Sequence, residues 1–147
     1  MATKVLRGDV RPPVSPRARV LLGRADALLS GSLGAESVAD QFLDCYMAAL
    51  RGAAAILEVA PATRARSRSA WVLLAKAEPE LEAWAEYFAS YSSLRAALQA
   101  GVSRSIDQDA ADTFYREVGR FLHVVEDFIG ADSRLDRALF PPRSMSA

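Results

Sequence analysis

Apolar residues along most of the chain recur at intervals of three and four, which places them on one face of a helix. The first such stretch follows Ser15, whose hydroxyl suits a helix cap and which precedes a proline. We predict a helix from there to about Ser30, where Gly31 and Gly34 end it.

The second stretch predicts a helix from about Ala35 to Val59 that stops before Pro61. Its second half is rich in alanine and glycine. Small side chains let a neighbouring helix approach closely, so we place this helix at the centre of a bundle.

A short helix is predicted over Ala70–Ala77, and Pro79 then starts or kinks the next element. That element is predicted to continue to about Ala100 and to end at Gly101. Arg95 falls near its apolar stripe, which predicts either an acidic partner or a position at a subunit boundary.

The last long helix is predicted to begin near Asp107 or Asp109 and to end at Ile129, before Gly130, with a short helical turn over 133–139. No stretch alternates polar and apolar residues between turns, so no strand is predicted. The predicted fold class is therefore all-α, a bundle of four to five helices with a short extra helix near the C-terminus.

Composition narrows the possible functions. The 147 residues fit one domain, predicted over 15–140, with a flexible arm at 1–14 and a flexible tail at 141–147. Lys+Arg and Asp+Glu are both 18, which argues against a strongly basic nucleic-acid binder. One cysteine and one histidine exclude an intramolecular disulfide and any multi-Cys or multi-His metal site, so no metal and no cofactor are predicted.

The chain shows no signal-peptide pattern and no apolar run long enough to cross a membrane. We therefore expect a cytoplasmic protein with no membrane partner. Arginine greatly outnumbers lysine and alanine is abundant, which indicates a GC-rich coding bias and favours a high-GC bacterium as the source.

One constellation in the last helix could carry chemistry. At about 100° per residue, a polar stripe with spacing i, i+4, i+7, i+11 lies opposite the apolar face and comprises Arg116, Arg120, His123 and Asp127. His123 and Asp127 are one turn apart and are predicted to pair. A solvated helix face explains such a stripe, but arginine also binds phosphate and histidine transfers protons near neutral pH.

Arg116, six further residues and His123 fit the pattern Arg-x(4–6)-His, which resembles the signature of the HEPN superfamily (higher eukaryotes and prokaryotes nucleotide-binding domains). Three segments are similar to the small actinobacterial SAV-type HEPN-like domain: QFLDCYMAALRGAAAILEVA, AWVLLAKAEPELEAWAEYFA and FYREVGRFLHVVEDFI. The resemblance covers roughly residues 16–130. It implies a homodimer paired along the last long helix, with RNA, a nucleotide or a protein such as an antitoxin as partner.

The resemblance also implies two kinds of function. Active members of the superfamily are metal-independent ribonucleases, many of them toxins or defence proteins, and others only bind nucleotides or proteins. Carried onto this chain, Arg116 and His123 are the catalytic pair, with support from Arg120 and Asp127. Glu117 adds negative charge beside the phosphate site, so we favour a binding module of toxin, defence or regulatory type. A ribonuclease is the alternative, and a structural bundle without a ligand is the second alternative.

A second basic feature is the segment that contains Arg64, Arg66 and Arg68. Closely spaced arginines of this kind could contact an RNA backbone. A solvated connector between two helices is the other interpretation of the same residues.

Overall fold

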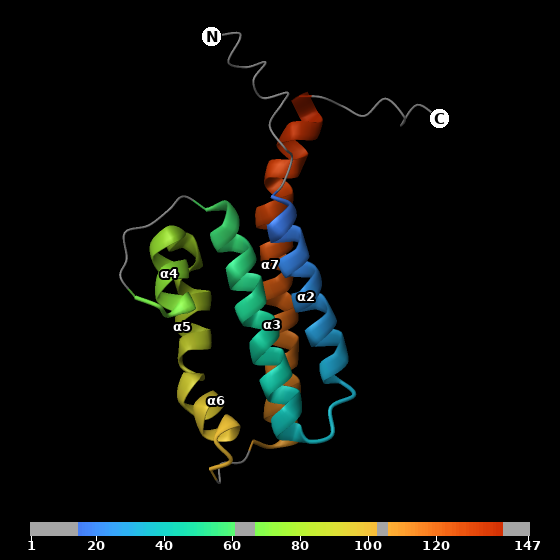
Figure 1. Ribbon diagram of the computed structural model, residues 1–147, viewed down its shortest axis with the longest axis vertical. Coiled ribbons are helices and arrows are strands. Elements are labelled where there is room, and N and C mark those ends of the chain that lie inside the picture. Colours follow the sequence, from blue (N-terminus) through green and yellow to red (C-terminus); the bar gives the residue numbers. More distant parts are fainter. Residues whose placement is uncertain (1–14, 61–66, 103–105, 140–147) are drawn as a thin grey trace.

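The central element of the fold is α3 (Val38–Val59), against which most other helices pack. The computed structural model describes residues 15–60, 67–102 and 106–139, with 131–139 as backbone only. Figure 1 shows α2 on one side of α3, α7 behind both, and α4 to α6 on the other side. The remaining elements are α2 (Pro16–Ser32), α4 (Ala70–Ala77), η1 (Pro79–Leu81), α5 (Glu82–Ala89), α6 (Ser92–Gln99) and α7 (Gln108–Leu139).

This arrangement confirms the predicted all-α class, since the described residues form helices and contain no strand. No helix in these parts of the chain is both long and apolar enough to span a membrane.

Serine side chains determine where the first two helices begin. The predicted cap is correct, because Ser15 Oγ accepts a hydrogen bond from the Ala18 N–H at 3.3 Å. The predicted start of α3 at Ala35 is too early, because Ser37 Oγ accepts from the Asp40 N–H at 3.0 Å and caps the helix there. The predicted end of α2 is also early, since Gly31 stays helical.

The element predicted to run unbroken from Pro79 to Ala100 is in fact three pieces. A turn at Ser90 and Tyr91 separates α5 from α6. At this turn the Ser90 hydroxyl donates to the Tyr87 carbonyl at 2.6 Å, and the Ser92 hydroxyl donates to the Ala89 carbonyl at 2.9 Å. Serine hydroxyls that bond to nearby carbonyls compete with the helical ladder, which favours a break at this point.

Two glycines predicted to end helices behave differently. Gly101 has a φ of +75° and ends α6, with the Val102 N–H donating to the Ala97 carbonyl at 3.0 Å. The predicted end of α7 before Gly130 is wrong, because the helix continues to Leu139 without interruption. Gly130 keeps a negative φ, and a glycine ends a helix in this way only when it adopts the left-handed conformation.

Aromatic side chains join the halves of the bundle. The Phe42 and Phe114 rings connect α3 to α7, with centroids 4.6 Å apart, and Phe88 and Phe121 connect α5 to α7 at 5.0 Å. Trp71 adds a polar link, because its Nε1–H donates to Tyr46 Oη at 2.9 Å in the buried core. The short helices α4 and α5 are therefore attached to α3 and α7 through their rings.

Gly52 sets how closely α3 and α7 approach. A Cβ atom at this position would lie 2.7 Å from Leu122 Cδ2 and 3.4 Å from carbons of Phe121 and Val125. The side chains of α7 therefore occupy the space that a larger residue in α3 would need, as the small-residue pattern predicted.

We expect Gly52→Val to destabilise the fold by about 1–3 kcal/mol, because the added carbons overlap with Leu122 and its neighbours. Gly23→Val in α2 is the matched control, since a Cβ there has no atom within 4 Å. Its expected effect is within about 0.5 kcal/mol. Urea unfolding followed by circular dichroism measures both, and equal stabilities of the two variants would contradict the close packing of α3 on α7.

Candidate functional site

The outer face of α7 is the candidate site, and the packing of the opposite face determines its orientation. The inner face is buried and apolar, and it comprises Ala111, Phe114, Val118, Phe121, Leu122, Val125 and Ile129. The polar residues predicted to lie opposite are all exposed, namely Arg116, Arg120, His123 and Asp127. The same helix thus serves as a wall of the core and as an open charged surface.

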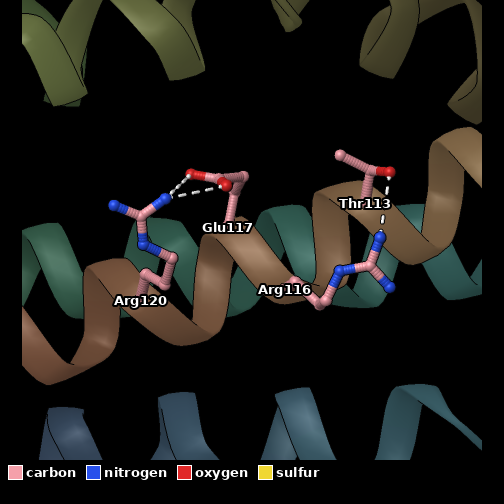
Figure 2. A network of polar contacts seen from close by, with 4 residues as sticks. All are labelled: Thr113, Arg116, Glu117 and Arg120. Carbon is pink, nitrogen blue, oxygen red and sulfur yellow. Dashed lines mark hydrogen bonds and ion pairs between the residues drawn. The ribbon is translucent and has the colours of Figure 1, made fainter.

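Arg120 pairs with Glu117 within this face. Its Nη1 lies 3.0 Å from Glu117 Oε2 and 3.2 Å from Oε1, and Figure 2 shows the two side chains meeting on one flank of α7. The Arg120 guanidinium also lies 5.9 Å from the centroid of the Trp84 ring of α5. The negative charge that follows Arg116 in the sequence is therefore matched by another cation.

Arg116 has only a neutral partner. Its Nη2 donates to Thr113 Oγ1 at 3.3 Å, and Figure 2 shows its guanidinium turned away from Glu117. Within the part of the chain that the structure describes, it forms no ion pair. Most of its donor capacity is consequently available to an anion from outside.

Asp112, one turn before Arg116, accepts hydrogen bonds from two side-chain amides. Hydrogen bonds from Gln41 at 3.1 Å and Gln108 at 2.8 Å hold the pKa of the Asp112 carboxyl below its usual value, and the charge of Arg116 acts in the same direction. This carboxylate is therefore bound by amide donors of α3 and α7 and does not form a close ion pair with Arg116.

His123 is open to solvent, with 82% of its side chain exposed. The predicted pair with Asp127 is wrong, because His123 Nδ1 lies 3.8 Å from Glu126 Oε1 instead. Both spacings, i+3 and i+4, bring side chains together on a helix, and here the imidazole turns toward the flank that faces α2.

That flank contains a residue that sequence analysis missed, Asp26 of α2. Partial burial raises the pKa of its carboxyl, the nearby Glu126 carboxylate raises it further, and His123 opposes the shift. No motif connects Asp26 to the last helix, so only the packing of α2 on α7 reveals this neighbour.

The basic segment lies elsewhere. Arg64 and Arg66 are outside the described residues, and Arg68 is exposed just before α4, away from the α7 face. Of the two alternatives for Arg95, the acidic partner is not found among the described residues, since its guanidinium lies 5.3 Å from the centroid of the Tyr46 ring and its Nη1 donates to Gln99 Oε1 at 2.8 Å. A position at a subunit boundary stays a prediction. Among the side chains described, no three His, Cys, Asp or Glu residues are grouped to hold a metal ion.

We expect Asp26→Asn to raise the melting temperature near pH 7 by roughly 1–2 °C, because a neutral amide avoids both the partial burial of a charge and the repulsion by Glu126. A raised carboxyl pKa means that the charged form destabilises the fold above that pKa, and the cost disappears below the ordinary value of 3.8. The gain should therefore shrink as the pH falls toward 4. Melting curves across this range measure it, and a gain that is independent of pH would contradict the assigned cost of the Asp26 charge.

Comparison with known proteins gives the family. Residues 32–126 match the model of the SAV_6107-like HEPN family, a region that contains α3 to α6 and both Arg116 and His123. Searches of curated proteins and of solved structures gave no match. The matched region covers well over half of the sequence and has the all-α architecture expected of the family. The chain therefore belongs to the SAV_6107-like HEPN family.

Proposed function

We propose that this protein is a homodimeric RNA-binding module in which Arg116 of α7 holds a phosphate of the RNA backbone. One observation supports this most: Arg116 is exposed and, among the described residues, has only a hydroxyl partner, while the adjacent Glu117 is paired with Arg120. A guanidinium without a carboxylate partner can form two parallel hydrogen bonds to a phosphate.

A homodimer would bring the two kinds of motif residue together across its interface. Arg116 and His123 are two helical turns apart, about 10 Å along the axis. If a second copy pairs antiparallel along α7, with the twofold axis midway between these two residues, the Arg116 of each chain lies near the His123 of the other. The paired faces then form one symmetric cleft with two phosphate-binding arginines.

Metal-independent ribonuclease activity is the second candidate function, and the exposure of His123 favours it. In that mechanism the imidazole takes the proton of a ribose 2′-hydroxyl as this oxygen attacks the phosphorus. The bond to the 5′-oxygen breaks, and that oxygen takes up a proton from water, so the products are a cyclic phosphate and a free 5′-hydroxyl. Arg116 would neutralise the charge on the phosphorus oxygens, and Arg120 and Asp127 would support the pair.

The cellular role that we propose is that of a bacterial toxin, defence or regulatory protein in the cytoplasm. The support is the family membership, because the HEPN superfamily includes toxins and defence proteins as well as binding modules. A protein partner such as an antitoxin would then cover the α7 face and block access of RNA to Arg116.

Binding and cleavage of labelled RNA in EDTA test the site. We expect Arg116→Ala to weaken RNA binding about tenfold, the effect of one charged hydrogen-bonding group, and the wild-type affinity to fall with added salt. Arg24→Ala, which removes the same charge from an exposed position of α2, is the matched control. If Arg116→Ala and Arg24→Ala bind RNA equally, Arg116 is not the phosphate ligand. Cleavage that is lost in His123→Ala would establish the ribonuclease.

Disulfide cross-linking tests the dimer. Cys45 is the only cysteine and is buried, so a cysteine added at the surface is the only accessible thiol. We expect Arg120→Cys, near the middle of the exposed α7 face, to form covalent dimers on mild oxidation. Ala27→Cys, on the exposed face of α2, is expected to remain monomeric in denaturing gels. A wild-type protein that sediments as a monomer at micromolar concentration would contradict the proposal.

A further inference from the structure

A second site lies on a different part of the molecule, in a cavity of about 430 Å³ between α3, the start of α4 and α6. Its lining combines cationic, hydroxyl and apolar side chains, from Tyr46, Leu50, Arg68, Ser69, Ala70, Trp71, Ser92 and Arg95. None of these residues belongs to α7, so the cavity is separate from the face described above. Its volume is within the range of small-molecule sites in proteins.

The charged side chains that line this cavity are all positive. Arg68 and Arg95 contribute two guanidinium groups from different elements, and no carboxylate is among the described residues that line the space. Two like charges that converge on one cavity repel each other unless an anion lies between them. The electrostatics therefore favour a negatively charged occupant.

Arg95 in particular has no carboxylate partner in the described part of the chain. Its guanidinium lies over the Tyr46 ring, and its Nη1 donates a hydrogen bond to the neutral amide of Gln99. Its Nε is buried and has no acceptor within the described structure. A buried donor without an acceptor costs free energy. An anion in the cavity would supply the missing negative charge.

The rest of the lining suits an apolar group. Tyr46 and Trp71 are held by the hydrogen bond between them, and Trp71 also stacks on Phe88 at 4.9 Å, so this part of the wall is already in place. Leu50 extends the apolar surface. Ser69 Oγ accepts from the Val72 N–H, which leaves the hydroxyl proton of Ser69 free to donate to an anion.

We propose that this cavity binds a small organic anion. Its carboxylate or phosphate lies between Arg68 and Arg95, and its aromatic or other apolar body lies against Trp71 and Leu50. The occupant is a small molecule, because α3, α4 and α6 limit the volume of the cavity. The proposal is independent of RNA binding at α7.

Titration of the intact protein with phenyl phosphate and with benzoate tests this site, and the comparison of the two distinguishes a phosphate from a carboxylate ligand. The indole N–H signal of Trp71 in ¹H–¹⁵N spectra reports occupancy, and that of Trp84, which does not line the cavity, is the internal reference. We expect saturable binding of at least one anion, with larger shifts at Trp71 than at Trp84. Benzyl alcohol, which has no charge, is expected to bind at least about tenfold more weakly.

Variants show whether the two arginines hold the anion. We expect Arg68→Gln and Arg95→Gln each to weaken binding about tenfold, and Arg19→Gln on α2 to leave it unchanged. Arg68 is exposed, so its variant keeps the test valid even if Arg95→Gln unfolds the protein. Absence of a Trp71 shift with both anions, or unchanged affinity in Arg68→Gln, would overturn the proposal.

Discussion

The close contact between α3 and α7 is the constraint on which the other features depend. Because Gly52 has no side chain, Leu122 of α7 occupies the space beside α3 where a Cβ would otherwise lie. This contact fixes the rotation of α7 about its own axis, since the same turn of helix that buries Phe121 and Leu122 must present the opposite side to solvent. The charged face of α7 is thus a consequence of the packing in the core.

Within that face, the arrangement of charges matters more than their sum. The chain has no net charge, yet Arg120 turns to Glu117 and Trp84 while Arg116 turns to the hydroxyl of Thr113. The acid that follows the motif arginine is therefore compatible with phosphate binding, because its charge is already paired. The proposed role of Arg116 in binding RNA rests on this local arrangement.

The α7 face and the proposed anion cavity lie on either side of the same aromatic core. Tyr46 lines the cavity, and its ring stacks on Phe114 of α7 with centroids 6.5 Å apart and an interplanar angle of 12°. Aromatic rings in close-packed interiors are held in place by their neighbours. The core that orients α7 therefore also holds the wall of the cavity, so one packed unit supports two surfaces with different chemistry.

Local patterns determined the helical class, the cap at Ser15, the bounds of α4 and the division of α7 into an apolar and a charged face. Each of these features depends on residues within a few positions of one another. The same patterns did not predict the break at Ser90, where hydroxyls compete for carbonyls, or the choice of Glu126 over Asp127 by His123. Arg68 and Arg95, like Asp26 and Glu126, are far apart in the sequence, and no local pattern connects them. Only the packing of separate helices brings such residues together, so the sequence determined the elements and the motif, and the tertiary structure decided which charges share a site.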